Sequence, residues 1–182
     1  MSPAVMFRVI EKFKPTILID EGDTFIKDNE DMRCMLNDGH NRQTSMVWRS
    51  VGDTHEPKPF KVWAPKALAM IGSPADTVED RSIVVHLKRQ LKTDKIEGFN
   101  ERRKAELYPI QRMLARWYED NQISLRSCRP EVPEALNDRA QDNVRALCAI
   151  ADVVGGHWPE LSDRRLLGWY RRAKKRSRCQ TV

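Results

Sequence analysis

Asp20 and Glu21 are adjacent carboxylates, and Asp23 follows two positions after Glu21. Three acids within four positions repel one another unless a cation lies among them. One carboxylate of such a pair can hold the magnesium ion of a bound nucleotide, usually through water. The other can orient or deprotonate the water that attacks the terminal phosphate. These residue types indicate metal-assisted phosphate chemistry, although a strand that simply meets a polar loop would also explain them.

The acids follow a short apolar, β-branched run, residues 16–19, which Pro15 can open but not interrupt. The run predicts a buried central strand of a parallel sheet, and ligands bind at the carboxyl ends of such strands. This order is typical of a Walker B element in a P-loop ATPase. The phosphate-binding loop Gly-x-x-x-x-Gly-Lys-Ser/Thr occurs nowhere in the chain, and the first 14 residues contain no glycine. The sequence therefore carries the metal half of a nucleotide site without its phosphate half.

Helices and strands are expected to alternate up to Leu91. A helix over residues 3–14, with Ser2 as its cap, should bury a stripe of apolar side chains. The members of that stripe are Val5, Met6, Val9, Ile10 and Phe13. A second helix over 30–36 should end at Gly39 in a left-handed cap. The expected strands are 46–51 and 60–63, which form an antiparallel hairpin, then 67–71 and 81–87.

The rest of the chain is predicted to be helical. The pattern predicts a helix over 95–121 that Pro109 kinks or splits, with an apolar stripe that includes Leu107, Ile110 and Leu114. A connector over 122–137 follows, and then a helix over 139–154, capped by Asp138 and stopped by Gly155. A last helix is expected over 162–177. The predicted fold class is α/β: a partial P-loop-like core of mostly parallel sheet with a hairpin (1–91), a helical extension (92–160) and a basic tail (161–182).

Composition places the positive charge at one end of the chain. The chain has 182 residues and a net charge of +6, yet eight basic residues follow Asp163, and the remainder holds 24 basic against 26 acidic residues. No apolar run approaches 18 residues and no signal peptide is evident, so we expect a cytoplasmic protein without a membrane segment. The four cysteines are scattered, which indicates neither a zinc site nor a disulfide framework.

The order of several motifs resembles a known family. The motifs are Phe7-Arg8-Val9-Ile10-Glu11, Pro15 to Glu21, Leu36-Asn37-Asp38-Gly39-His40, Trp63 to Gly72, Asp76 to Ile83, Leu136-Asn137-Asp138-Arg139-Ala140 and Ala149-Ile150-Ala151-Asp152. From about Pro3 to Pro159 the chain is similar to a bacterial family of unknown function found in phage, plasmid and integrated-element proteins, often beside primase or helicase modules. Its full-length members resemble P-loop ATPases related to AAA+ and viral replicative helicases. They carry the Walker A loop upstream of the segment that matches residues 6–11. The match fades beyond Pro159, so the resemblance implies that this chain is a fragment.

The resemblance implies Mg²⁺ and ATP as cofactors and gives roles to four residues. Asp20 would hold the magnesium ion and Glu21 would be the catalytic base. Arg81 would stabilise transition-state charge on the phosphate, as a guanidinium can. An ion pair of Arg81 with a nearby acid explains it equally well. The candidate acids are Asp76, Glu79 and Asp80. Lys66 would be a polar nucleotide sensor, with a solvated lysine as the alternative.

Two groups of residues are expected to contact nucleic acid. His40, Arg42 and Arg49 lie around the predicted hairpin, and hairpins of ring helicases touch the nucleic-acid strand; a structural polar loop is the alternative. The basic tail places cations near Trp169 and Tyr170, so it can contact phosphates and stack on bases. Its cations include Arg171, Arg172, Lys174 and Lys175. A solvated end would also account for them.

The function expected from these features is that of a mobile-element DNA-replication ATPase module, resembling primase-associated helicases. Without a phosphate-binding loop, the chain is not expected to hydrolyse ATP by itself. Its expected partners are single-stranded or duplex DNA, the primase or helicase modules of the same element, and possible further copies of itself. The alternative is a non-catalytic DNA-binding or assembly subunit that uses the basic tail. The third hypothesis is that the chain is a degenerate remnant without activity.

Overall fold

The computed structural model describes residues 2–26 and 29–179, apart from the side chains of Phe25 and of residues 173–179. The chain forms two compact units, which we call the N-terminal unit (residues 1–82) and the helical unit (residues 83–182). Each unit has its own cluster of buried apolar side chains. The chain thus combines helices and strands with a small parallel sheet, followed by a helical region, as the α/β expectation requires. None of the helices in the described part combines the length and apolar composition needed to cross a bilayer.

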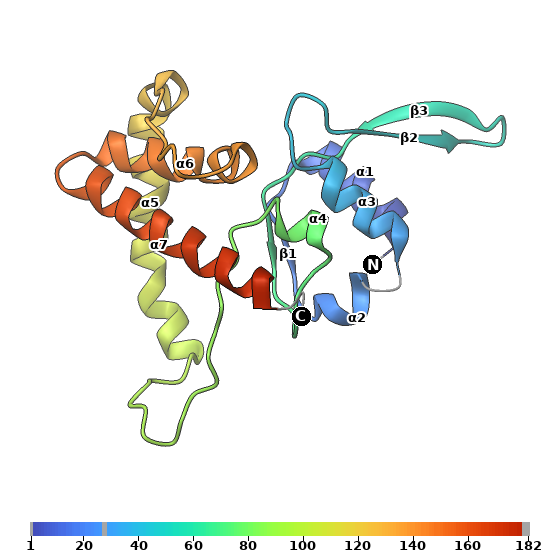
Figure 1. The fold of residues 1–182 in the computed structure, drawn as a ribbon. Coiled ribbons are helices and arrows are strands. Elements are labelled where there is room, and N and C mark those ends of the chain that lie inside the picture. The colour runs from blue at the N-terminus through green and yellow to red at the C-terminus, as the bar shows by residue number, and fades with distance from the viewer. Residues whose placement is uncertain (1, 27–28, 180–182) are drawn as a thin grey trace. The chain divides into compact units, whose positions relative to one another are not determined.

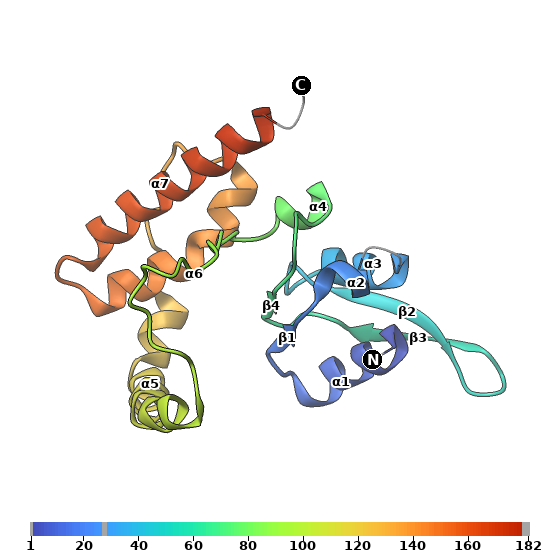
Figure 2. The ribbon, with the colours of Figure 1, turned by 90° about the horizontal axis from the view of Figure 1, so that it is seen from below.

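The described residues of the N-terminal unit form two sheets of two strands each. Its elements are α1 (Pro3–Phe13), β1 (Ile17–Ile19), α2 (Gly22–Ile26), α3 (Glu30–Asp38), β2 (Met46–Val51), β3 (Glu56–Lys61), β4 (Lys66–Leu68) and α4 (Asp76–Glu79). β1 pairs in parallel with β4, with Ile17 opposite Lys66 and Ile19 opposite Leu68. β2 pairs with β3 in an antiparallel hairpin that extends beyond α1 and α3 (Figure 1, Figure 2).

The core of this unit forms where α1 and α3 pack against the strands. Met6 and Ile10 of α1 and Met32 of α3 are almost completely buried, and the rings of Phe7 and Phe60 lie 4.7 Å apart between centroids. The expected α1 stripe is therefore displaced, because Phe7 is buried whereas Val5 and Phe13 of the predicted set are exposed.

The strand β1 is buried on one face only, which corrects the expectation of a strand buried on both. Ile17 and Ile19 belong to the core, but Leu18 between them is 77% exposed. Side chains of a strand alternate between its two faces, and here only one face meets the core. The pairing with β4 is parallel, as expected, but β4 is the one strand that pairs with β1 among the described residues.

The hairpin is longer than expected, and its second strand contains two prolines. β3 begins at Glu56 instead of Phe60, and Val47 lies opposite Phe60, Arg49 opposite Lys58 and Val51 opposite Glu56. In an antiparallel pair alternate residues turn their N–H groups toward the partner. Pro57 and Pro59 occupy the intervening positions, so their missing N–H groups fall on the outer edge. The prolines therefore permit the β2–β3 ladder and block a further strand on that edge.

The strand expected over residues 81–87 is absent from the described structure. Residues 83–91 form no helix or strand, and most of their side chains are exposed. β-branched residues favour strands only when a partner strand takes up their backbone groups. Here the carbonyl of Val84 instead accepts a hydrogen bond of 2.9 Å from Nε1 of Trp169 in the last helix.

The helical unit consists of α5 (Glu101–Ser127), α6 (Asp138–Val154) and α7 (Trp158–Cys179). α6 packs on α7 around Val144, Cys148, Leu166 and Tyr170, with Leu136 of the connector completing the cluster. The α6 cap is Asn137 and not Asp138, since the Asn137 side chain accepts from the Ala140 N–H at 2.9 Å. α6 ends at Gly155, as expected.

α5 starts later than expected and runs through its proline without being split. The Asn100 side chain accepts from the Arg103 N–H, so the helix starts at Glu101 and not near Lys95. Pro109 lies inside the helix and leaves the Ala105 carbonyl without its usual helical donor. Ala105 and Pro109 are both exposed, so water can satisfy that carbonyl.

Gly39 ends α3 for a steric reason and not for the expected left-handed one. Its φ is −77°, which any residue adopts. A Cβ atom placed on Gly39 would lie 2.6 Å from the Val62 carbonyl oxygen and 2.8 Å from the Met35 carbonyl oxygen. Both oxygens are backbone atoms in the packed part of the unit. They cannot move aside without shifting α3 or the segment between β3 and β4.

We therefore expect Gly39→Ala to lower the free energy of unfolding by about 1–3 kcal/mol, the usual cost of overpacking. Gly98→Ala is the matched control, because no heavy atom lies within 4 Å of a Cβ at that position. Urea denaturation followed by circular dichroism and tryptophan fluorescence measures both. Equal stability of the two variants would contradict the steric role of Gly39.

Candidate functional site

The two adjacent acids lie at the carboxyl end of β1, as the sequence predicts. Asp20 and Glu21 are exposed and follow the last strand residue directly. Oδ1 of Asp20 accepts a hydrogen bond of 2.9 Å from the Glu21 N–H. Glu21 has a φ of +55°, in the left-handed region that non-glycine residues seldom adopt. The turn thus holds both carboxylates at the strand edge in a conformation that costs free energy.

Contacts to β4 and the segment after it hold this turn in place. The Gly22 N–H donates to the Ala69 carbonyl at 2.9 Å, and Oδ1 of Asp23 accepts from the Ile71 N–H at 3.2 Å. The Thr24 hydroxyl donates to the Glu21 carbonyl at 2.8 Å. Asp23, the third acid of the cluster, is therefore bound to backbone, whereas the Glu21 carboxylate has no partner among the described residues.

The donor set at this edge fits a hydrated magnesium ion. Mg²⁺ keeps several waters and is typically held through one or two carboxylates plus substrate phosphates. Asp20 and Glu21 supply two exposed carboxylates on a fixed turn. In the part of the chain that the structure describes, no three His, Cys, Asp or Glu side chains are grouped so that they could enclose a metal ion. The edge is therefore suited to a water-mediated half-site and not to an all-protein cage.

Lys66 lies away from the two acids, at the opposite end of the β1–β4 pair. It pairs with Ile17, the first residue of β1, whereas Asp20 follows the last. Its ammonium donates to the carbonyl oxygens of Gly39 at 2.9 Å and Ala64 at 3.1 Å. Burial lowers the pKa of Lys66 to about 8. These two hydrogen bonds link the end of α3 to the residues that precede β4.

Arg81 is half-buried and is engaged with its own helical turn. Its Nη1 donates to the Thr77 carbonyl at 2.8 Å, just after α4. Thr77 in turn accepts a hydrogen bond of 3.3 Å from the Asn37 amide through its hydroxyl, which links α4 to α3. No strand begins at Arg81, so the position implied by the resemblance, at the start of a strand, is not the one observed.

The cations expected at the hairpin contact aromatic and acidic side chains of the N-terminal unit. The Arg42 guanidinium lies 4.9 Å from the centroid of the Trp63 ring. Arg49 forms an ion pair of 3.2 Å with Asp31. His40 is half-buried beside the end of α3. Two of the three residues expected to contact nucleic acid, Arg42 and Arg49, therefore have partners within the N-terminal unit.

A different part of the hairpin is open to solvent. Met46, Trp48 and Ser50 share one face of β2, opposite Lys61, Pro59 and Pro57 of β3. Trp48 is 60% exposed on this face. Trp48 was not among the residues predicted to contact nucleic acid. Alternation along the strand places Trp48 and Val47 on opposite faces but does not say which of the two faces the core.

The basic tail is helical as far as it is described. Arg171 and Arg172 are exposed residues of α7. Lys174 and Lys175 belong to the same helix, but their side chains lie outside the described part of the structure.

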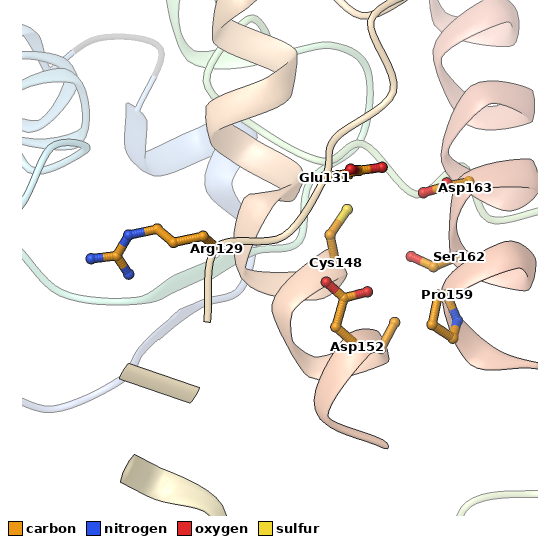
Figure 3. Close-up of a pocket in the computed structure, with 8 residues that line it drawn as sticks. Arg129, Glu131, Cys148, Asp152, Pro159, Ser162 and Asp163 are labelled. Atoms are coloured by element: carbon orange, nitrogen blue, oxygen red, sulfur yellow. The ribbon is translucent and has the colours of Figure 1, made fainter. Parts of the chain in front are cut away.

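The helical unit contains a cavity that the sequence analysis did not anticipate. It has a volume of about 240 Å³ and lies between α6, α7 and the connector. Figure 3 shows Glu131, Asp152 and Asp163 around the Cys148 thiol, with Arg129 directed away from it. Widely separated sequence positions meet here, so no local pattern marks the cavity.

The cavity is electrostatically unfavourable for negatively charged groups. Burial, together with the negative charges of Asp152 and Glu131, raises the pKa of Asp163. Burial, followed by the same kind of repulsion from Asp163, raises the pKa of the Cys148 thiol, so the thiol stays protonated at neutral pH. An acid with a raised pKa favours the folded unit at low pH, and that contribution is lost as the pH rises through the raised pKa.

Comparison with known proteins identifies one family. The family described as "Protein of unknown function (DUF3631)" matches residues 86–179. Comparison with curated proteins and with solved structures gave no match. The family match continues to Cys179, which corrects the expectation that the resemblance fades beyond Pro159. It starts at His86, so the acids of the β1 edge lie outside the matched residues.

We expect the stability of the N-terminal unit to depend on the ionisation of Lys66. Because folding lowers the Lys66 pKa from 10.5 to about 8, the unfolded chain binds this proton more tightly between those values. The free energy of unfolding should therefore rise with pH across this window in the wild type, relative to Lys66→Met. Urea denaturation at pH 7.5 and pH 10 measures the difference.

Lys92→Met, which removes an exposed lysine, is the control and should keep the wild-type pH dependence. Carbon-13 NMR of the lysine ε-carbons gives a direct check, with one resonance expected to titrate near pH 8. A Lys66→Met variant with the same pH dependence as the wild type would contradict the assignment.

Proposed function

The chain belongs to the family described as protein of unknown function DUF3631, and we propose that it is a module of an ATPase that acts in the DNA replication of mobile elements, similar to primase-associated helicases. The observation that carries the proposal is the pair Asp20 and Glu21, exposed on a strained turn at the carboxyl end of a parallel strand. Ligands of α/β sheets bind at that edge, and an unfavourable backbone conformation is often retained where function needs it.

Each acid has a separate role in the proposal. Asp20 holds the hydrated magnesium ion of the nucleotide, and Glu21 orients or deprotonates the attacking water. Magnesium supplies charge neutralisation at the phosphates when it is bound. Arg81 completes the charge stabilisation if its guanidinium leaves the Thr77 carbonyl, to which it donates in this structure.

The 182 residues contain no Gly-x-x-x-x-Gly-Lys-Ser/Thr loop. A P-loop cradles phosphates with backbone N–H groups and a lysine, and this preorganised charge supplies much of the rate of phosphoryl transfer. Lys66 does not substitute for that lysine, since two carbonyl oxygens hold its ammonium at the other end of the strand pair. We therefore expect magnesium binding by this chain without turnover of ATP.

The test uses Mn²⁺ as a paramagnetic substitute for Mg²⁺. We expect Mn²⁺ to broaden the NMR amide signals around Asp20, Glu21 and Gly22 selectively in the wild type. Asp20→Asn should weaken this binding by roughly 10- to 100-fold, the usual cost of losing a partner that holds a metal through its outer shell. Asp53→Asn, which alters an exposed acid in the hairpin turn, is the matched control. Equal broadening in the wild type and in Asp20→Asn would refute the metal site.

A second candidate function is DNA binding through the hairpin. Trp48 is exposed beside Met46 and Pro59, with Lys61 on the same face. Single-stranded nucleic acids bind where aromatic side chains stack on bases near cations that contact phosphates. This arrangement favours the non-catalytic DNA-binding alternative more than Arg42 and Arg49 do, because those two cations are engaged within the unit.

We expect Trp48→Ala to weaken binding of single-stranded DNA by roughly 5- to 100-fold, in line with the stacking free energy of one base. Fluorescence anisotropy with a labelled oligonucleotide measures this at two salt concentrations. Trp158→Ala removes a similarly exposed tryptophan from the helical unit and should leave the affinity unchanged. A loss confined to the double variant Arg171→Ala/Arg172→Ala would assign DNA binding to the basic end and not to the hairpin.

A further inference from the structure

The helix α5 has no buried residue along its 27 positions. Four of its apolar side chains nevertheless recur with helical spacing: Leu107, Ile110, Leu114 and Tyr118. They are 42%, 51%, 63% and 53% exposed, respectively. We call this stripe the α5 face. Amphipathic helices gain most of their stability by covering such a face, so its exposure indicates a missing partner.

The α5 face continues an interface that already exists within the helical unit. Trp117, Asn121 and Leu125 lie further along the same side of the helix and are half-buried, and α5 contacts α6 within this unit. The N-terminal turns of α5 extend away from α6 (Figure 1). α6 therefore covers the C-terminal part of the side, and the α5 face is the remaining part.

The chemistry of the α5 face selects an apolar occupant. Charged residues along this part of the helix, such as Arg112, Arg116 and Asp120, fall on other sides of it. Arg116 and Asp120 pair with each other at 2.9 Å. Between Leu107 and Tyr118 the α5 face therefore offers no cation to a nucleic-acid phosphate and no like charges that would oppose self-association. Arg103 continues the stripe one turn earlier, and its guanidinium pairs with Glu106 at 2.7 Å and with Glu97 at 3.5 Å.

Its spacing is self-complementary. A two-fold axis near Ile110 would place Leu107 of each copy opposite Leu114 of the other. The Leu107–Leu114 contact would therefore occur twice in the dimer, because a two-fold interface uses the same surface of both copies. Met113 flanks the stripe and is 70% exposed. Together these side chains expose on the order of 500 Å² per copy, so their complete burial in two copies would remove at most about 1,000 Å² from solvent, the area that a specific interface should reach.

We propose that the chain forms a homodimer in which the α5 faces of two copies pack against each other, antiparallel and crossing near Ile110. The dimer interface uses no residue of the β1 edge, so the result of its test is independent of the proposed nucleotide chemistry. It assigns the stripe to a second copy of this chain and not to nucleic acid.

Sedimentation equilibrium over about 1–100 μM protein tests the proposal. We expect a monomer–dimer equilibrium for the wild type and a dimer dissociation constant at least about 100-fold higher for Leu114→Glu, because dimerisation would bury two unpaired carboxylates. Ile123→Glu is the matched control: Ile123 is 79% exposed on the opposite side of the same helix, and its variant should dimerise like the wild type. Circular dichroism verifies that the helices persist in both variants.

A second variant gives an independent readout. Ile110→Cys, in a background in which Cys34, Cys128 and Cys179 are replaced by serine, should form a cross-linked dimer on mild oxidation, whereas Ile123→Cys should not. A wild type that stays monomeric at all concentrations would overturn the proposal. Equal weakening by Leu114→Glu and Ile123→Glu would overturn it as well, since it would show that the α5 face has no special role.

Discussion

The parallel hydrogen bonds between β1 and β4 determine where the acids of this protein lie. The Ala69 N–H donates to the Ile19 carbonyl at 2.8 Å, and the Gly22 N–H donates to the Ala69 carbonyl at 2.9 Å. Ala69 thus fixes both the last residue of β1 and the first residue of α2. Asp20 and Glu21 are the two residues between these anchors, so their place at the strand edge follows from the backbone and not from their own side chains.

The close approach at this junction depends on small residues. A Cβ on Gly22 would lie 2.3 Å from the side chain of Leu68 and 3.3 Å from the Ala69 carbonyl oxygen. At the other end of the strand pair Gly39 leaves room for the Lys66 ammonium, which bonds to the Gly39 carbonyl. The small parallel sheet is therefore held at both ends by contacts that a larger side chain would disturb, and its short length offers few other bonds to compensate.

The local pattern of apolar and polar residues correctly predicted the elements that their own sequence is sufficient to specify. The strand 46–51 has the predicted bounds, and α6 differs from the prediction by one residue at its start. The expected strand over 81–87 failed because its β-branched residues meet no partner strand, and Trp169 takes the Val84 carbonyl instead. Whether such a segment forms a strand depends on pairing with residues far away in the sequence. The hydrophobic periodicity of the segment itself does not reveal that pairing.

The same limit applies to side-chain roles. The sequence correctly placed Asp20 and Glu21 after a strand, since only the next residue along the chain was needed. The position of Arg42 and Arg49 around the predicted hairpin did not reveal their partners, because the Trp63 ring and the Asp31 carboxylate that they contact are distant in sequence. Trp48 is exposed because Val47 beside it faces the core, and that assignment requires knowing which face of the hairpin is covered.

The proposed metal site and the proposed dimer interface belong to units with separate cores. Asp20 lies in a unit organised around Met6, Ile10 and Met32, whereas α5 belongs to the unit organised around Val144. Substitutions that share no contacts have additive effects on stability and binding. Asp20→Asn should thus leave dimerisation intact, and Leu114→Glu should leave Mn²⁺ binding intact. Coupling between these two variants would mean that the two units act on each other.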